Sequence, residues 1–584
     1  MTNPSAFDRR SFFALCSLMG VGHPAFAEAL WRKARRAGMT GPEDFVAGQA
    51  QAPGITVTKE MVAAAAAMMG LEFSEQEKDE LVQALPSTLG LVAQIHQIPL
   101  ANGISPALRF DPELPGKAVK GGIRLRLDDD THRPRVARPD SATALAFMTV
   151  AELGSLLKNR KVTSTELTTL YLDRLKRHGP TLQCVVTLTE DRALAQARKA
   201  DEEILAGKYR GPLHGIPWGA KDLFAVPGYP TTWGTPPYKD QRLEETATVV
   251  ERLDRAGAVL VAKLTLGELA MGDVWFGGTT KNPWKVDQGS SGSSAGPGSA
   301  TAAGLVAFAL GTETLGSIVS PSDRNGVAGL RPTYGRVSRS GAMALSWSMD
   351  KPGPMCRSAE DCGYVLAAIH GADGRDGSAV DRPFGWSPAS KIGGLKIGYL
   401  KAAFDADHPT KAFDEAVLRQ LRALGADPIP VDFTSQVPVA ALRVILQAES
   451  AAAFDELTRS NRDDLMTRQG KGTWPSNFRT SRFIPAVEYI NANRARTLVM
   501  REMDRFMETV DLFVMPSFGG DMLLVTNLTG HPSLTVPSGF RDDGTPVSIS
   551  FVGRLWGEAD LVTVGKAYQE ASGWHRRHPP LFSE

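Results

Sequence analysis

Serine and lysine side chains stand in two short segments of this sequence where they could do chemistry together. The first segment, residues 289–320, reads GSSGSSAGPGSATAAGLVAFALGTETLGSIVS. The apolar run at 305–310 is not typical of a flexible Gly/Ser linker. It predicts a buried element between two Gly/Ser turns. Such an arrangement brings backbone N–H groups and serine hydroxyls close together at one end of a packed core.

The second segment is GIPWGAKDL, residues 215–223, in which Lys221 follows a run with strand character. In one interpretation its stem lies on apolar surface while its amine reaches water. In the other, burial between Ala220 and Leu223 lowers its pKa, and the neutral amine acts as a base. Lys221 alone leaves both interpretations open.

Together the two segments resemble the amidase signature family, whose pattern is G-I-P-x-x-x-K-D, then G-G-S-S-G-G-S, then G-T-D-x-G-G-S-I. The matching stretches here are GIPWGAKD at 215–222, SGSSAGP at 291–297 and GTETLGSI at 311–318. Ser290-Ser291 also looks like the serine pair, but only Ser293-Ser294 gives the family's separation to Ser317. The resemblance covers roughly residues 148–575 and continues through GLRPT at 329–333, GPM at 353–355, NLTGHP at 527–532 and Val536-Pro537.

The resemblance implies that Ser317 is the nucleophile, Lys221 the base and Ser293 a proton relay between them. It also implies a cis peptide bond between Gly292 and Ser293. Amide hydrolysis needs a nucleophile, a base for its proton and donors for the oxyanion. A Ser-Lys pair is a known variant of the serine triad, and no G-x-S-x-G elbow indicates the histidine form. Taken singly, Ser317 would be a helix N-cap and Ser293 a turn residue; the motifs in register favour catalysis.

The resemblance places the oxyanion hole in the backbone N–H groups of Thr314, Leu315, Gly316 and Ser317. Glycine at 316 allows unusual dihedrals and close backbone approach. The chain departs from the family pattern at Leu315, which replaces a glycine, at Val319, which replaces a common arginine, and at Glu313, which replaces a common aspartate. None of these removes a catalytic group, so they bear on substrate choice. Ser294 either supports Ser317 by hydrogen bonding or closes the turn, and both interpretations stay open.

The segment MGDVWFGG, residues 271–278, lies where the resemblance implies a pocket lining, and we expect the pocket to be built from residues 271–280 and the variable region 435–500. Met271, Trp275 and Phe276 are the candidate lining residues. For Trp275 and Phe276, pocket lining and plain packing are both open.

Composition narrows the class of protein. The chain has 584 residues, 42% hydrophobic and 22% charged, with a formal net charge of +1. That charge gives no broad electrostatic case for nucleic acid, and no stretch is long and apolar enough to span a membrane. The four cysteines lack metal spacing and indicate neither a disulfide framework nor a zinc site. Without a P-loop or a dinucleotide fingerprint, we expect no cofactor and no metal.

The N-terminus carries its own signals. Asp8 to Phe13, DRRSFF, resembles a twin-arginine export signal, and Ala25-Phe26-Ala27 has the form of a cleavage site. His23 and Pro24 interrupt the apolar run, so an ordinary first helix is the alternative. An exported or periplasmic protein follows from the first interpretation and a cytoplasmic one from the second. We expect a signal or first helix at 1–27, a helical extension and connector at 28–147, and an amidase signature domain at 148–584.

Local patterns predict several elements and an α/β class. Thr58 predicts the start of a helix at 59–69 that ends at Gly70, and the capping boxes at 74–77 and 163–166 open two more helices. A helix near 246–256 precedes a strand at 257–263, and another helix–strand unit spans about 411–432. This alternation argues for α/β. The resemblance implies a mixed central sheet covered by helices on both faces, with a mainly helical N-terminal extension.

The sequence thus predicts a serine amidase that hydrolyses a carboxylic amide through an acyl-enzyme. Its expected partner is a small-molecule amide, with esters and carbamates also suited to the chemistry; a homodimer stays open. One rival is the glutaminase component of a glutamyl-tRNA amidotransferase, which has the same triad; the long extension counts against it. The other rival is a binding module without activity on an amidase scaffold, against which the intact Lys-Ser-Ser set counts.

Overall fold

A computed structural model describes residues 56–95, 101–104, 108–114 and 136–583 of the chain. The predicted export signal at 1–27 and Cys16 lie outside the described residues. The chain divides into two compact units, residues 1–101 and 102–584. No described helix is both long and apolar enough to cross a membrane.

The first unit contains the two helices predicted from their capping residues. Helix α4 spans Lys59–Met68, and the Thr58 hydroxyl accepts a hydrogen bond from Met61 N. Helix α5 spans Glu75–Ile95 and opens with the predicted box, in which Ser74 N donates to the Glu77 carboxylate at 2.7 Å. A side chain that accepts a free N–H at a helix start fixes where the helix begins, which is why both starts could be predicted.

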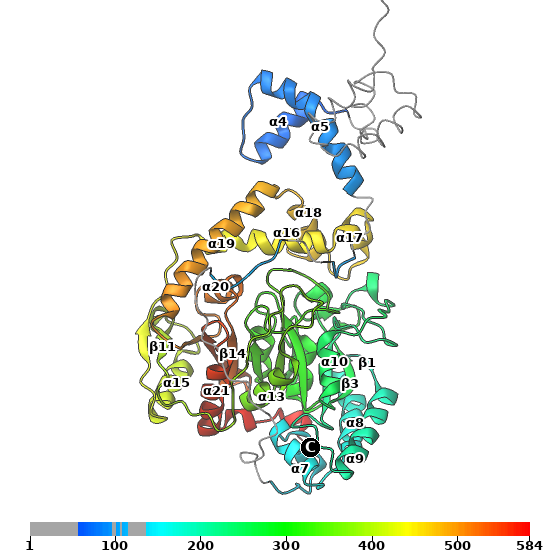
Figure 1. The fold of residues 1–584 in the computed structure, drawn as a ribbon, viewed down its shortest axis with the longest axis vertical. Helices are drawn as coiled ribbons and strands as arrows, with labels where there is room; N and C mark the ends of the chain where they lie inside the picture. Colours follow the sequence, from blue (N-terminus) through cyan, green and yellow to red (C-terminus); the bar gives the residue numbers. More distant parts are fainter. Residues whose placement is uncertain (1–55, 96–100, 105–107, 115–135, 584) are drawn as a thin grey trace, which may run out of the picture. The chain divides into compact units, whose positions relative to one another are not determined.

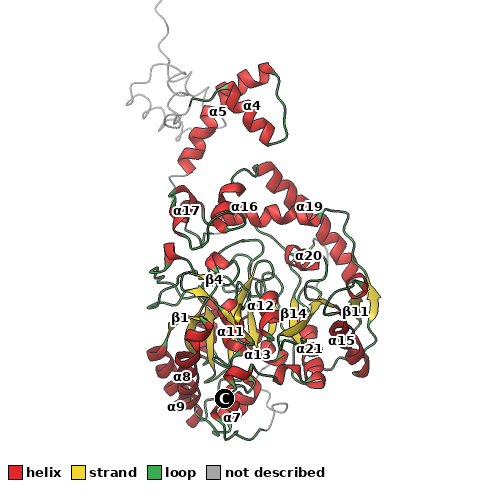
Figure 2. Cartoon of the chain, turned by 180° about the vertical axis from the view of Figure 1, so that it is seen from behind, coloured by secondary structure: helices red, strands yellow, loops and turns green. Residues whose placement is uncertain are grey.

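The second unit is built on one eleven-stranded mixed sheet (Figures 1 and 2). Strands β2, β3 and β8 run parallel at one end, as do β11, β12 and β13 at the other, and the remaining pairs are antiparallel. In sheet order the strands are β1 (Val185–Leu188), β3 (Val259–Leu264), β2 (Pro217–Lys221), β8 (Phe308–Glu313), β10 (Lys351–Cys356), β9 (Ala328–Arg331), β14 (Ser533–Phe540), β15 (Pro546–Gly553), β13 (Leu512–Pro516), β11 (Ile397–Leu400) and β12 (Ile429–Val431).

Helices cover both faces of this sheet, as the family resemblance implied. Neighbouring residues of a strand face opposite sides. Gly329 faces α12 (Val319–Asn325), where an added β-carbon would clash with Ser322 Oγ. The next residue, Leu330, pairs with Leu534, whose side chain packs on Gly565 of α21 (Glu558–Ser572). The fold is therefore an α/β arrangement with a mixed central sheet between helical layers.

The remaining helices of the second unit agree with the predicted units where the sequence made a prediction. The capping box at Thr163 opens α8, α10 precedes β3, and α15 precedes β12. These helices are α6 (Ala142–Ala146), α7 (Val150–Lys158), α8 (Ser164–Leu182), α9 (Glu190–Leu205), α10 (Thr248–Arg255), α11 (Ala295–Ala302), α13 (Ala359–Ile369), α14 (Lys401–Asp405), α15 (Lys411–Ala423), α16 (Arg443–Ala453), α17 (Asp455–Arg459), α18 (Trp474–Ser481), α19 (Ala486–Met507) and α20 (Met522–Thr529).

Helix α11 was not predicted, because its sequence AGPGSATA is rich in residues that disfavour helices. Packing explains it. A β-carbon at Gly296 would lie 2.5 Å from Thr265 N, so only glycine lets the helix approach β3 this closely. The helix starts directly after Ser294 and holds the Ser/Gly turn against the sheet.

Candidate active site

Lys221 is the last residue of β2, in the parallel part of the sheet between β3 and β8. Its side chain is completely buried. Strand β2 packs closely beside β3 because Gly219 leaves room for the Leu264 side chain, with which an added β-carbon would clash. The strand thus delivers one amine into the interior at its carboxyl end, where ligands of open α/β sheets bind.

The amine of Lys221 is surrounded by hydroxyl groups. Its Nζ lies 2.8 Å from Ser293 Oγ, 3.1 Å from Ser294 Oγ and 2.9 Å from Thr312 Oγ1. The Thr312 carbonyl oxygen is 3.4 Å away. No carboxylate among the described residues forms a salt bridge with this amine.

Burial lowers the pKa of Lys221 to about 7, although the charges of Asp350 and Glu313 act to raise it. The neighbouring carboxylate of Asp222 points away from this amine. It lies 2.7 Å from Lys263 Nζ and accepts a hydrogen bond from Thr232 N. The amine is therefore in a position where its neutral form is well populated near pH 7.

Ser293 and Ser294 lie in the turn between β7 (Lys285–Gly289) and α11. The peptide bond from Gly292 to Ser293 is cis, as the family resemblance implied. Ser294 Oγ donates to the carbonyl of Thr312 and accepts from its N–H, both at 3.1 Å. The Ser294 side chain therefore fastens the turn to β8, and it is Ser294 N that donates to the Ser317 carbonyl, at 3.2 Å.

The alternative serine pair, Ser290-Ser291, is not hydrogen-bonded to Lys221 in the described part of the chain and has other partners. Ser291 Oγ lies 2.6 Å from Ser320 Oγ, and Ser290 Oγ donates to the Ser291 carbonyl. The contacts of Lys221 thus agree with the register chosen from the family separation.

Ser317 lies in the short loop between β8 and α12, and only 9% of it is exposed. Within the described part of the chain, no acceptor is found for the N–H groups of Leu315, Gly316 and Ser317. Gly316 has a φ of +81°, a conformation that favours glycine. Unpaired N–H groups of consecutive residues can form a concave site that binds a negatively charged oxygen.

The Ser317 hydroxyl makes no hydrogen bond with any described residue. The structure therefore brings Lys221 and Ser293 together directly, whereas the hydrogen bond between Ser293 and Ser317 that a relay requires is not formed in it. Catalytic hydrogen bonds are often long in an unliganded enzyme and shorten when the substrate binds.

Glu313 fixes the loop, a role that was not predicted from the sequence. One carboxylate oxygen accepts the N–H groups of Ile318 and Val319 at 2.8 and 3.0 Å. The other accepts Arg331 Nη1 and Asn527 Nδ2, both at 2.8 Å. Burial acts to raise the pKa of Glu313, but the charge and hydrogen bond of Arg331 outweigh it and lower the pKa to about 2.

Both partners of Glu313 stand in stretches that carried the family resemblance, GLRPT and NLTGHP. The sequence therefore identified Arg331 and Asn527 as members of family motifs, but it did not predict that they contact Glu313. Thr314 makes a further contact that sequence reasoning missed: its hydroxyl donates to Asp350 Oδ1 at 2.5 Å. The loop that bears Ser317 is thus held by two buried carboxylates.

The candidate pocket segment lies against the serine turn. Next to Met271, the Gly272 carbonyl packs on Gly292 so closely that an added β-carbon there would clash with it. Trp275 and Phe276 pack edge to face at 4.7 Å between ring centroids, and Trp275 is buried. The variable region contacts the residues just before this segment, since Trp474 Nε1 donates to the Leu269 carbonyl at 3.0 Å.

Comparison with known proteins gives the family. A family model described as Amidase matches residues 166–525. The A subunit of the glutamyl-tRNA(Gln) amidotransferase of Methylococcus capsulatus is 35% identical over 478 residues, covering 74% of this chain and 98% of that protein.

Solved structures of peptide amidases are also similar to this chain. The native peptide amidase from Stenotrophomonas maltophilia is 32% identical with a TM-score of 0.65, covering 75% of this chain and 99% of that one. The peptide amidase PAM in complex with the competitive inhibitor chymostatin is 33% identical with a TM-score of 0.66, covering 74% and 99%. The chain therefore belongs to the amidase family and is a hydrolase that acts on amides.

Proposed function

We propose that this protein is a serine amidase in which Ser317 attacks the amide carbonyl, Ser293 relays the proton and Lys221 is the base. The observation that carries the proposal is the contact of 2.8 Å between Ser293 Oγ and a buried Lys221 amine whose pKa is lowered to about 7. A lysine titrating near neutrality is suited to general base catalysis, whereas an unperturbed lysine is not.

In the proposed acylation step, neutral Lys221 accepts the Ser293 proton while Ser293 accepts the proton of Ser317. The Ser317 oxygen forms a bond to the carbonyl carbon, and the carbonyl oxygen becomes an oxyanion. The N–H groups of Leu315, Gly316 and Ser317, with Thr314 as a further candidate donor, would stabilise that charge. The tetrahedral intermediate then expels the amine, which takes the proton back from Lys221 through Ser293.

Deacylation uses the same groups with water as the nucleophile. Water gives its proton to the Ser293–Lys221 pair, attacks the ester and releases the acid, and Ser317 regains its proton. Both steps need Ser317 Oγ within hydrogen-bond reach of Ser293 Oγ, so substrate binding is expected to close that contact.

The substrate class is a carboxylic amide, with esters and carbamates as further candidates because the same attack suits them. Leu315 is half-buried and packs against the apolar cluster that includes Met349 and Leu528. An apolar side chain at this point of the loop favours an apolar group next to the reacting carbonyl.

A second candidate function is that of the glutaminase component within a glutamyl-tRNA amidotransferase. It is favoured by the 35% identity to the Methylococcus capsulatus protein, which spans 98% of that protein. The two functions differ in whether the chain needs a partner, ATP and tRNA.

Purified full-length chain should hydrolyse acyl amides of graded chain length without ATP, tRNA or a second protein. Release of ammonia or amine would be measured, with Ser317→Ala as the control for contaminating activity. If hydrolysis appeared only in a co-purified complex, as glutamine-dependent transamidation, the second function would replace the first.

A further inference from the structure

The second compact unit begins with a segment that precedes the matched family residues 166–525 and lies against loops of the same unit. This segment consists of residues 102–104 and 108–114, here called the strap. Five of its side chains contact residues far along the chain, and two of them, Asn102 and Phe110, are connected to the loop formed by residues 344–350.

Asn102 binds the start of that loop through its side-chain amide. Its Oδ1 accepts the N–H of Ala344 at 2.6 Å, and its Nδ2 donates to the Ala344 carbonyl at 2.8 Å. The same Nδ2 is 3.3 Å from the carbonyl of Ala453, the last residue of α16. One half-buried amide thus joins the 344–350 loop to the end of a helix.

Phe110 reaches the middle of the loop through two neighbours. Its ring meets Tyr334 edge to face at 5.0 Å, and the Tyr334 hydroxyl donates to the Trp347 carbonyl at 2.6 Å. The Arg496 guanidinium lies 3.5 Å from the centroid of the Phe110 ring and donates to both the hydroxyl and the carbonyl of Ser348, each at 2.9 Å.

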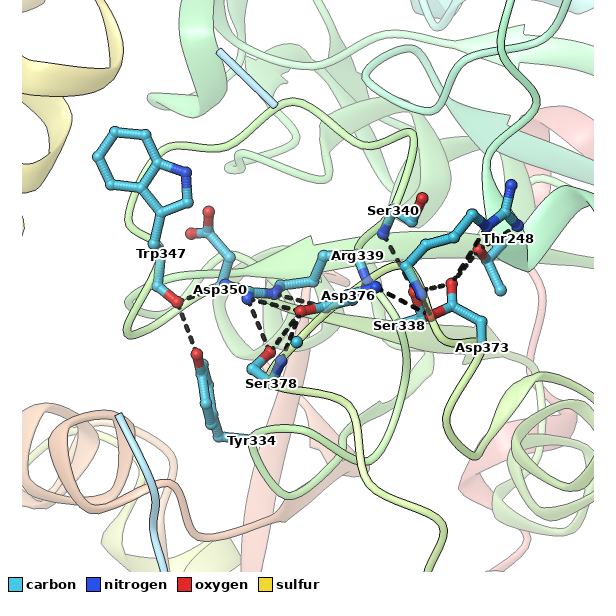
Figure 3. Close-up of polar contacts among 12 residues, drawn as sticks. Thr248, Tyr334, Ser338, Arg339, Ser340, Trp347, Asp350, Asp373, Asp376 and Ser378 are labelled. Carbon is cyan, nitrogen blue, oxygen red and sulfur yellow. Dashed lines mark hydrogen bonds and ion pairs between the residues drawn. The ribbon is translucent and has the colours of Figure 1, made fainter. Parts of the chain in front are cut away.

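The far end of the loop touches the segment that bears Ser317. Asp350 Oδ2 accepts the N–H groups of Leu345 and Ser346 at 2.8 and 2.9 Å, and Oδ1 accepts the Thr314 hydroxyl. Figure 3 shows Asp350 and the Trp347 carbonyl beside Arg339, which is itself held by Asp376 and Ser378. A short series of hydrogen bonds through this loop therefore connects Asn102 with Thr314.

Other contacts keep the strap in place. Arg109 donates to the Gly377 carbonyl, and both carboxylate oxygens of Glu113 lie 2.7 Å from Arg382 Nη2. Pro112 is buried against Gly530, where an added β-carbon would lie 2.9 Å from its Cβ. Since the strap is fastened at both sides of Phe110, it can act as a fixed support.

We propose that the strap positions the 344–350 loop and, through Asp350 and Thr314, the N–H groups that bind the oxyanion. Asn102 is its main positioning residue. This inference rests on the proposed function, because the oxyanion donors of residues 314–317 matter only for attack by Ser317. Such donors must lie about 2.7–3.1 Å from the oxyanion, so a small displacement of the loop lowers the rate.

The test measures how fast a fluorophosphonate labels the serine nucleophile in full-length protein. Asn102→Ala and the isosteric Asn102→Asp should both lower the labelling rate constant and kcat by between about 10- and 100-fold. In the aspartate variant a carboxylate faces the carbonyls of Ala344 and Ala453, so it should not restore the rate. KM should stay as in the wild type, because the substitution removes no group that binds the substrate.

Leu108→Ala is the matched control, since its side chain lies in the same strap and is 77% exposed. It should be labelled at the wild-type rate. A role of Asn102 in stability alone would lower the melting temperature and the final labelled fraction while leaving the rate constant of the folded fraction unchanged; that result would overturn the proposal.

If Asn102→Ala does not give folded protein, Phe110→Leu decides by the same measurement. A loss of labelling rate supports the strap, and a wild-type rate overturns it. Ser317→Ala separates the two proposals: if it is still labelled, the proposed function fails, whereas if it is unlabelled and the Asn102 variants react normally, only the strap proposal fails.

Discussion

At the scale of single residues, the proposed mechanism depends on one lysine whose neutral form is populated near pH 7. Lys221 is buried at a strand end without a salt bridge among the described residues, and three hydroxyl groups surround its amine. Burial disfavours the charged form and lowers its pKa, while the charges of Asp350 and Glu313 partly oppose this. The adjacent Asp222 is kept from interfering because it pairs with Lys263.

The pH dependence of kcat/KM should report this lysine. Below a pKa of about 7 the amine is protonated and cannot accept a proton, so the rate should fall about tenfold per pH unit. Above it the amine is neutral, and the rate should level off by about one to two units higher.

In Lys221→Met the overall rate should be much lower and this ionisation should be absent, because the methionine side chain is nearly as long as lysine but cannot take a proton. A wild-type profile that is flat from about pH 5 to 9 would be incompatible with a lysine base that titrates in this range.

At the scale of elements, β8, the 314–318 loop and α12 form one unit whose geometry depends on Glu313. Its carboxylate accepts two backbone N–H groups of the loop and pairs with Arg331, and all of these groups are buried. The sequence predicted a buried apolar element between two Gly/Ser turns. It did not predict the clamp, because residues 313, 331 and 527 are brought together only by the packing of β9 and α20 around the loop.

Glu313→Gln should destabilise the protein by about 3–5 kcal/mol, because it leaves the Arg331 guanidinium buried without its counter-charge. It should also shift the pH midpoint of activity downward, since the Glu313 charge raises the pKa of Lys221. Denaturant unfolding and the pH–rate profile measure the two effects.

Glu313→Asp is the control, because it keeps the charge and shortens the side chain by one methylene. It should keep the pH midpoint near that of the wild type. If the glutamine variant were as stable as the wild type with an unchanged midpoint, Glu313 would not have the positioning role assigned to it here.

The elements also show where sequence patterns stop being informative. Capping residues Thr58, Ser74 and Thr163 fixed three helix starts, because the signal is local to one turn. Helix α11 escaped prediction because its glycines serve tertiary packing against Thr265 and oppose the local propensity. The contacts of the strap could not be predicted from local patterns either, because Asn102 and Ala344 are 242 positions apart.

At the scale of the whole molecule, the family resemblance predicted the mixed sheet, its two helical layers and the amidase class. The predicted domain boundary at 147/148 stays a prediction. The compact unit of the structure starts earlier, at Asn102, and therefore includes the strap. The export signal at 1–27 also stays a prediction, because no described residue bears on it. The motifs do not identify the substrate, because the candidate pocket residues Met271, Trp275 and Phe276 lie outside them.

Covalent labelling of the intact protein tests the central claim, that Ser317 is the nucleophile, most directly. A fluorophosphonate should add one adduct, which peptide mapping by mass spectrometry should place on Ser317. Ser317→Ala should lose labelling and several orders of magnitude in hydrolysis rate. Ser291→Ala, in the serine pair whose hydroxyl bonds to Ser320, should label as the wild type does. An adduct on another serine, or undiminished labelling of Ser317→Ala, would contradict the account.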